Sequence, residues 1–554
     1  MASSAELYDL FLREIGALDD FWAERSRDGQ LRLGPEDPDT RRLIEAMAFF
    51  AARTRAAASE AMEAAMVRMA GETLDDLLAP MPAAALVEAA PAGRLHADVT
   101  IARGSLLRLQ FVDPTITADT RAPRRSFGPT QPPGERIALF STLDTVVVRP
   151  LIIESAAVVG SRRALQIEVR LRASVPQARA FDLDLHVRRL ADYRASLALH
   201  LALEQHTTRV IARSSDGAEM PCHVRFGPPV PGSPIDDSDS RSPLTRIRSF
   251  FHFPEQDLTI RVSIPAQAKP WERLTLRFEL DERWPEEQGV STESFRLFVV
   301  PAVNLWSDFA APIVYDGTKD TVPIVSATAT REAAELVSLR GVYQADREMA
   351  PLLPFSLAQE RDGYELLRRA EGGAALLRVR LSDAFGEPRK LFADVVWSQP
   401  SLWSTSPTDV RVLPQLKVLN GVDLRLLGAV RRPQQSPLAS DPSRCLDVMS
   451  LKMRPVLDRR SVAGLLSLLG ACGDSPYRGF PDRIDALTVR DAADPSRRAG
   501  GIKHVYDVHI RSGSSADAPL VVRFQEQLAA LLDAWTQDAV EVRMAPSGVG
   551  GASP

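Results

Sequence analysis

At Pro80-Met81-Pro82 the hydrophobic period of this sequence changes. Before these residues, apolar side chains recur every three or four positions, which is the period of an amphipathic helix. After them, short alternating runs such as "RALQIEVRLRAS" are separated by Gly, Pro and Ser, as in antiparallel β-sandwiches and barrels. The sequence therefore predicts an α+β, β-rich multidomain protein that begins with helices.

The N-terminal segment predicts a helical hairpin. A first helix is expected over residues 5–25, and a second is expected to start at Asp39 or Thr40, which are good N-cap residues, and to run toward Leu78 with one break. Its Leu, Phe and Met stripes exceed what two helices need to cover each other, so a partner chain is expected to complete a bundle; packing within the chain is the alternative. The partner-interface candidates are Leu7, Phe11, Leu18, Phe21, Trp22 and Phe49.

The remaining chain predicts several further domains, because 554 residues exceed what one hydrophobic core supports. Alternation in "LQIEVRLR" places Leu165, Ile167, Val169 and Leu171 on one face of a strand. The expected boundaries are 1–82 for the helical region, 83–300 for a β-rich domain with a long polar loop at 227–245, 301–435 for a second β-rich domain, 436–545 for a mixed α/β C-terminal domain, and 546–554 for a disordered tail.

Charge, cysteine content and hydropathy exclude several classes of protein. A net charge of −5 gives no basic face for nucleic acid. Three cysteines far apart suit neither a disulfide framework nor a CxxC metal site, and they favour a reducing compartment. The acidic N-terminus does not resemble a signal peptide, and the apolar stretches fall short of the roughly 20 residues that span a bilayer. We expect a cytosolic protein whose partner is another protein or a small molecule.

Local motifs for chemistry are missing from the sequence. It contains no phosphate-binding loop, dinucleotide fingerprint, nucleophile elbow or zinc-protease helix motif. His200 and His206 lie off a common helical face, and His504 and His509 are expected on opposite faces of a strand. We therefore nominate no catalytic, cofactor-binding or metal-binding residue and expect no enzyme.

The stretch "VVPAVNLWSDFAAPIVYDGTKDTVPIV" could be an active-site loop or a scaffold. Asn304 lies where a strand gives way to a turn, and its amide is expected to satisfy backbone groups locally. Trp306 and Phe309 are expected to fix the loop to a core, and Asp308 and Asp316 to form turns. The scaffold interpretation is favoured over the catalytic one.

Several separated stretches resemble the TssF family (also called ImpG or VasA) of type VI secretion baseplate subunits. "YDLFLREIGALDDFWAERSRD" and "DPDTRRLIEAMAFFAARTRA" are similar to the start of that family, and "DVMSLKMRPVLDRRSVAGLLSLLG" to its C-terminal third. The resemblance rests on the order of these stretches along the chain. It identifies the protein as a divergent member of the family. Between these ends, the structural-motif positions are Phe251, Phe253, Pro254, Pro301, Asn304 and Trp306, of which Trp306 stands where the family has Phe.

The resemblance implies a structural wedge subunit without a cofactor. It implies two TssF copies with one TssG-like subunit in each wedge, TssK-like proteins bound through TssG, and indirect contact with TssE-like and spike-like proteins. It also implies a cytoplasmic baseplate that partners dock at the inner face of the membrane. The alternatives are a wedge protein of a phage tail or extracellular injection particle, or a β-rich hydrolase or carbohydrate-binding protein using carboxylates such as Asp308 and Glu335.

Overall fold

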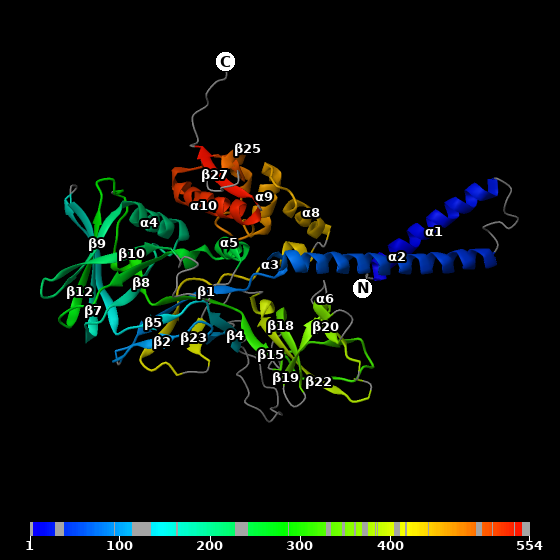
Figure 1. Ribbon diagram of the computed structural model, residues 1–554, viewed down its shortest axis with the longest axis horizontal. Helices are drawn as coiled ribbons and strands as arrows, with labels where there is room; N and C mark the ends of the chain where they lie inside the picture. Colours follow the sequence, from blue (N-terminus) through cyan, green and yellow to red (C-terminus); the bar gives the residue numbers. More distant parts are fainter. Residues whose placement is uncertain are drawn as a thin grey trace, which may run out of the picture. The chain divides into compact units, whose positions relative to one another are not determined.

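The computed structural model divides into two compact units, Met1–Leu78 with Pro437–Arg454, and Ala79–Ser436 with Pro455–Pro554. Figure 1 follows the chain from its N-terminal helices in blue to its C-terminal elements in red. The structure describes residues 4–27, 38–93, 95–112, 135–161, 164–227, 242–285, 287–327, 334–345, 349–358, 362–367, 375–382, 384, 386–403, 410–415, 418–440, 443–494, 501–511, 513–536 and 538–545.

The first unit is helical, which confirms the predicted N-terminal hairpin. Helix α1 packs along α2, and the pairs Arg41–Asp19 (2.9 Å) and Arg55–Glu14 (2.8 Å) show that the two run antiparallel. The expected break falls at Leu74, between α2 and α3, and α8 packs against α2. The helices are α1 Ser4–Arg27, α2 Pro38–Thr73, α3 Asp75–Leu78, α7 Pro437–Ser440 and α8 Ser443–Lys452.

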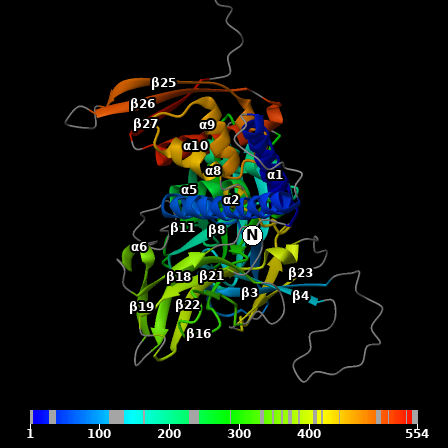
Figure 2. The ribbon, with the colours of Figure 1, turned by 90° about the vertical axis from the view of Figure 1, so that its right-hand side faces the viewer.

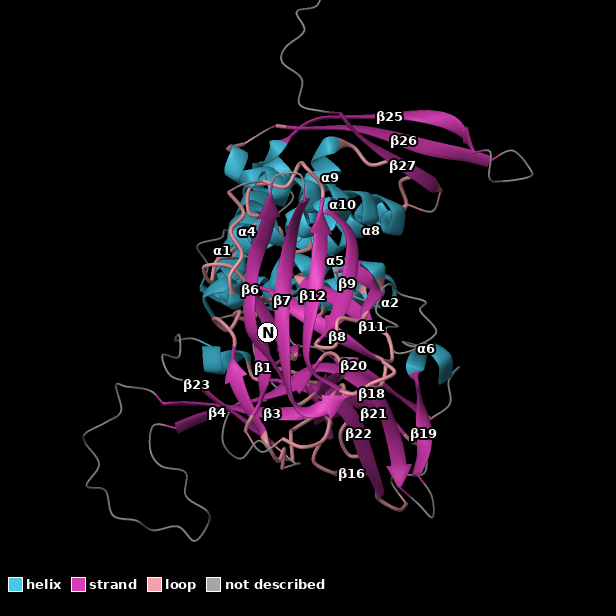
Figure 3. Cartoon of the chain, turned by 90° about the vertical axis from the view of Figure 1, so that its left-hand side faces the viewer, coloured by secondary structure: helices cyan, strands magenta, loops and turns pink. Residues whose placement is uncertain are grey.

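The second unit contains a sheet that curls into a barrel. Its order is β13-β8-β11-β10-β9-β12-β7-β6, and its two end strands contact each other. Figure 3 shows β6, β7, β12 and β9 side by side. As the alternation predicts, Ile167, Val169 and Leu171 are buried inside, with Leu165 partly buried. The strands are β6 Leu151–Ser161, β7 Ala164–Gln177, β8 Phe181–Val187, β9 Thr207–Ser214, β10 Glu219–Phe226, β11 Thr259–Ile264, β12 Trp271–Leu280 and β13 Phe295–Leu297.

A second sheet shares the hydrophobic core of this barrel. Its order is β23-β3-β4-β14-β1-β24, and β23 and β24 at its two ends also contact each other. β2 Val99–Ile101 and β5 Val146–Val148 form a small separate pair. The six strands are β1 Ala84–Pro91, β3 Leu106–Val112, β4 Glu135–Thr142, β14 Val299–Val303, β23 Val410–Pro414 and β24 Val422–Leu426.

A third sheet has its own core, which includes Trp306, Tyr315, Val395 and Trp397. Its order is β15-β22-β18-β19-β20-β21-β17, with β16 pairing to β22. The short helix α6 Phe355–Ala358 follows β19. The domain boundaries expected from the sequence stay predictions. The strands are β15 Trp306–Phe309, β16 Ile313–Tyr315, β17 Thr321–Pro323, β18 Glu335–Ala345, β19 Met349–Pro354, β20 Gly363–Leu367, β21 Leu376–Arg380 and β22 Arg389–Ser398.

The C-terminal region mixes helices and strands, as predicted. β25 and β26 pair antiparallel and β26 and β27 parallel, while α10 packs against β27 (Figure 2). Helix α10 buries Phe524 and Trp535 and contacts α4 and α5. The elements are α9 Arg459–Leu468, β25 Ile484–Asp494, β26 Gly501–Ile510, α10 Ala518–Trp535 and β27 Ala539–Ala545.

Two further helices, α4 and α5, both pack against α10. α4 Tyr193–His206 begins at the N-cap Asp192, whose carboxylate accepts a hydrogen bond from the N–H of Ala195. α5 Pro243–His252 begins after the N-cap Ser242, so the polar loop expected at 227–245 is wrong at its C-terminal end. Residues 228–241 of that loop, and the expected tail at 546–554, lie outside the described residues.

The short 3-10 helices are η2 Pro254–Asp257, η3 Thr292–Ser294, η4 Pro400–Trp403, η5 Pro481–Arg483 and η6 Ser515–Asp517. None of the described helices combines the length and hydropathy needed to cross a bilayer.

Candidate functional site

Helix α2 carries an apolar stripe that is exposed in the structure. Leu43, Met47 and Phe50, at spacings of four and three residues, are 62%, 54% and 66% exposed. Residues at these spacings share one side of a helix. We call Leu43, Met47 and Phe50 the α2 stripe.

A separate set of α2 side chains packs inside the unit. Thr40, Ile44, Ala48 and Ala52 are buried, each four residues after the last, and α1 packs along this helix. The two alanines allow close approach of the helices because they carry no bulk beyond Cβ. The exposed α2 stripe is therefore additional to the face that the hairpin itself buries.

The structure divides the six predicted interface residues into two groups. Leu7, Phe11, Leu18 and Trp22 are partly buried and recur at helical spacing along α1. Their role at an interface with another chain is thus a proposal that competes with packing inside the hairpin. Phe21 and Phe49 are exposed, and Arg25 lies over the ring of Phe21 at 5.5 Å.

Sequence reasoning missed the α2 stripe. Its six candidates include only Phe49 from α2, whereas Leu43, Met47 and Phe50 are all more exposed than Phe49. The available signal was the spacing of Leu43, Met47 and Phe50. At 100° per residue, these three residues lie about 60 to 120° around the helix from Ile44. Hydrophobicity alone could not tell which of two adjacent apolar stripes the neighbouring helix covers.

The Phe-Pro positions of the family resemblance belong to the packed interior. Phe251 is fully buried, with its ring 5.6 Å from that of Tyr477 and 6.3 Å from that of Phe524. Phe253 joins a small buried cluster with Leu86, and Pro254 is buried at the start of η2. These residues hold α5 in place and present no reactive group.

Asn304 is a buried connector between strands. Its side-chain N–H donates to the carbonyl of Leu139 at 2.7 Å, and its side-chain oxygen accepts from the N–H of Gln399 at 2.8 Å. Its amide does satisfy backbone groups, but these belong to distant strands, so the expected local role is wrong. Pro301, in the neighbouring β14, is partly buried.

The aromatic residues after Asn304 behave differently from each other. Trp306 is buried in the core of the third sheet, as expected. Phe309 is 44% exposed and contacts Tyr343 and Phe392, so the expectation that it fixes the loop to a core is wrong. Asp316 accepts from the N–H of Thr318 at 3.0 Å, which confirms its predicted turn.

The carboxylates that a hydrolase would need do not converge. Asp308 lies opposite Val395 on one side of β22, and Glu335 lies opposite Ser398 on the other side. Val395 and Ser398 are three residues apart in β22, so strand alternation turns them, and the two carboxylates opposite them, to opposite faces of the sheet. Paired glycosidase carboxyl groups instead face one cleft, about 5 to 9.5 Å apart. The carboxylate of Asp308 instead accepts from the N–H of Phe309. Among the described residues, no three His, Cys, Asp or Glu side chains could hold one metal ion.

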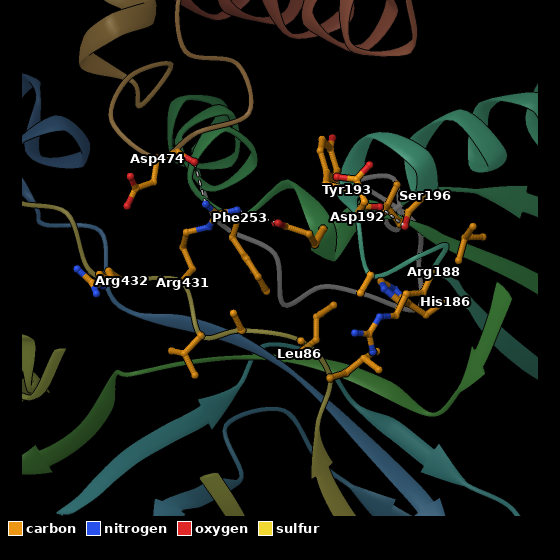
Figure 4. A pocket seen from close by; sticks show the side chains of 18 residues that line it. Leu86, His186, Arg188, Asp192, Tyr193, Ser196, Phe253, Arg431, Arg432 and Asp474 are labelled. Carbon is orange, nitrogen blue, oxygen red and sulfur yellow. Dashed lines mark hydrogen bonds and ion pairs between the residues drawn. The ribbon is translucent and has the colours of Figure 1, made fainter. Parts of the chain in front are cut away.

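One cavity of about 320 Å³ lies in the second unit, between β8, the start of α4, the η2 segment and residues 427–432 (Figure 4). Its apolar wall includes Leu86 and Phe253, while Arg188, His186 and Arg431 supply polar groups. Arg431 donates to Glu255 at 2.7 Å and to the carbonyl of Asp474 at 2.9 Å. The sequence patterns gave no sign of this cavity, because its residues come from five separate segments.

Two solved structures share this fold. A chain of the type VI secretion TssK–TssF–TssG baseplate subcomplex, determined by cryo-electron microscopy, superposes with a TM-score of 0.70 at 16% identity, covering 91% of this chain and 95% of that chain. A chain of the type VI secretion baseplate complex has a TM-score of 0.57 at 15% identity, covering 98% and 97%. The fold is thus one found in type VI secretion baseplates. No curated protein matches the chain by sequence.

A family model separates this chain from the other contractile systems that the sequence left open. Residues 21–371, more than half of the chain, match the family described as "Type VI secretion system, TssF". The chain belongs to the TssF family.

Proposed function

We propose that this chain is a structural subunit of a type VI secretion baseplate, and that its helical unit joins a helical bundle with a TssG-like protein. The α2 stripe carries the second part of this proposal, because three large apolar side chains on one helix face remain exposed. Covering each of them would stabilise a complex by about 1.5 to 3 kcal/mol. The subcomplex that shares the fold contains a TssG chain beside its TssF, which supports this choice of partner.

The remaining partners follow from the same role. We expect two copies of this chain with one TssG-like subunit, a TssK-like protein attached through that subunit, and more distant TssE-like and spike-like proteins. The baseplate would work at the inner face of the cytoplasmic membrane, to which its partners would attach it. TssK and TssG accompany TssF in the similar subcomplex, which supports the first part of this arrangement.

The proposed work of the subunit is mechanical and involves no turnover of a substrate. A baseplate must hold an extended sheath and then allow it to contract, so its interfaces need two stable arrangements. The separation of Asp308 from Glu335 supports this role over the hydrolase alternative.

The test is co-expression of the chain with its TssG-like partner, followed by native mass spectrometry of the purified complex. The wild type should give two copies of this chain for each partner. The double variant Leu43→Asp/Phe50→Asp should weaken the complex at least about tenfold, since hot-spot side chains each contribute more than about 1 kcal/mol. Arg42→Asp, at an exposed position of α2 that is neither three nor four residues from any residue of the α2 stripe, is the matched control and should leave the complex intact.

The helical content of the double variant must match that of the wild type by circular dichroism. A folded double variant that keeps the partner at normal stoichiometry would show that the bundle does not use the α2 stripe. A wild-type chain that binds no TssG-like partner would overturn the whole proposal.

A further inference from the structure

The cavity described above is bordered on one side by an arginine that has acceptors, and on the other side by two residues whose side chains have no hydrogen-bond partner among the described residues. On the first side, Arg431 has both Glu255 and the carbonyl of Asp474 as acceptors. On the other side, Arg188 and His186 lie next to each other and border the cavity (Figure 4). Neither of these two side chains has a hydrogen-bond partner among the residues that the structure describes.

Arg188 is a partly buried cation at the edge of the cavity. Its backbone N–H donates to the carbonyl of Ser294 at 2.9 Å, which holds the residue directly after β8. Its guanidinium makes no hydrogen bond or ion pair with any residue that the structure describes. Burial, and then the charge of Arg296, lower the pKa of Arg188, and the more weakly acting Glu88 opposes them. An anion in the cavity would relieve this unfavourable environment.

His186 is a buried polar side chain without a partner. Strand alternation turns Leu185 and Val187 into the barrel core and His186 to the other side, where it borders the cavity at 4% exposure. Within the described part of the chain, neither ring nitrogen has a hydrogen-bond partner. The ring nitrogens are not fully enclosed, so an acceptor supplied by a ligand in the cavity can reach the ring N–H.

The backbone beside these two residues is held in a constrained turn. Leu190 and Ala191 have φ angles of 51° and 53°, in the left-handed region that non-glycine residues rarely adopt. Ser196 accepts from the N–H of Arg189 at 2.8 Å and donates to the carbonyl of Asp192 at 2.6 Å, which fixes the turn. Such strain persists only where the surrounding structure enforces it, and it is common at ligand sites.

The start of α4 adds to the positive potential at this side. α4 is a 14-residue helix, and Tyr193 in its first turn borders the cavity. The positive end of its dipole therefore faces the same space. The negative charge of the Asp192 carboxylate would repel an anion. This carboxylate, however, already accepts a hydrogen bond from the N–H of Ala195 as the helix cap.

We propose that the cavity binds a carboxylate group, with the guanidinium of Arg188 and a ring N–H of His186 as its donors. A planar guanidinium and a carboxylate match in a two-pronged pair. The carboxylate comes either from a free small dicarboxylate or from an acidic side chain of a protein partner. The second source rests on the proposed baseplate function, and the first does not.

The first experiment measures the thermal unfolding midpoint of the full chain against rising succinate, with sodium chloride at equal ionic strength as the reference. Succinate should raise the midpoint saturably in the wild type. Arg188→Gln should weaken succinate binding at least about tenfold, the effect of losing one charged hydrogen-bond donor. Arg179→Gln, at an exposed position outside the cavity, should bind succinate like the wild type.

The second experiment compares the affinity of Arg188→Glu and Arg179→Glu chains for the TssG-like partner. A loss confined to Arg188→Glu identifies a protein carboxylate as the source, and succinate binding without such a loss identifies a free one. Arg188→Lys, which keeps the charge, should restore part of either effect and shows that the losses do not reflect misfolding. If succinate binds no better than chloride and the partner affinity of Arg188→Glu is unchanged, the inference is wrong. If the Leu43→Asp/Phe50→Asp variant still weakens the complex with the TssG-like partner, the proposed function stands even when this inference fails.

Discussion

The side-chain oxygen of Asn304 accepts a hydrogen bond from the backbone N–H of Gln399 at 2.8 Å, across 95 residues of sequence. The same side chain donates to the carbonyl of Leu139 at 2.7 Å. Asn304 is fully buried, so no water replaces either contact if the side chain is removed. One amide therefore joins β4, the β14–β15 connection and the end of β22.

Replacing Asn304 with Ala should lower the free energy of unfolding by about 2 to 4 kcal/mol, because it leaves a buried N–H and a buried carbonyl unpaired. Urea unfolding followed by tryptophan fluorescence would measure this, since Trp306 and Trp397 lie in the adjoining core. Asn420→Ala, at an exposed turn, is the matched control and should change stability by no more than about 0.5 kcal/mol. Equal effects of the two substitutions would contradict the connector role.

Three buried histidines predict a loss of stability in mild acid. Burial lowers the pKa of His186 to about 3 and those of His200 and His252 to about 4, against 6.5 in the unfolded chain. Between these values the unfolded state binds more protons, so the stabilisation is complete above pH 6.5 and is lost as the pH falls toward 4.

Each of these histidines should contribute about 2 kcal/mol of the stability lost between neutral pH and about pH 5. Urea midpoints measured across this range would test the prediction. In His200→Gln the slope of stability against pH should be smaller, although the variant is less stable overall. A slope unchanged by the substitution would mean that the pKa of His200 is the same in the folded and the unfolded chain.

Substitutions on the two sides of α1 should separate folding from partner binding. Phe11→Asp places a charge at a partly buried position, and it should destabilise the helical hairpin by about 2 kcal/mol. Circular dichroism and limited proteolysis of residues 4–73 within the full chain would report this loss.

Phe21→Asp should change the stability of the hairpin by no more than about 1 kcal/mol, because the Arg25–Phe21 contact that it removes contributes about that much. It should nevertheless weaken the complex with the TssG-like partner, as measured by co-purification. If Phe21→Asp binds normally, Phe21 is an exposed residue outside the bundle.

Two glycine substitutions should change stability in opposite directions. Gly160, near the end of β6, has φ +113°, and a Cβ added there would overlap the carbonyl of Ala164, so Gly160→Ala should destabilise by about 2 to 4 kcal/mol. Gly464 lies inside α9 with open space at its Cβ position, so Gly464→Ala should stabilise by about 0.5 to 1 kcal/mol. Thermal unfolding of both variants would check the two signs.

Periodicity determined much of the fold of this protein. The alternation that buries Ile167, Val169 and Leu171, and the helical spacing of α1 and α2, are local consequences of backbone geometry and can be read from neighbouring residues. The order of short family-like stretches along the chain was likewise a property of the sequence alone. These features were sufficient to indicate an α+β baseplate subunit of the TssF family.

The tertiary structure alone decided which of these residues meet. Met47 and Ala48 are adjacent and both fit an apolar stripe, yet only the position of a neighbouring helix exposes the first and buries the second. Asn304 finds Gln399, and Arg188 and His186 come to one cavity wall with Phe253, only after distant strands have paired. Contacts between residues far apart depend on the packing of the whole core, and no local pattern carries that information.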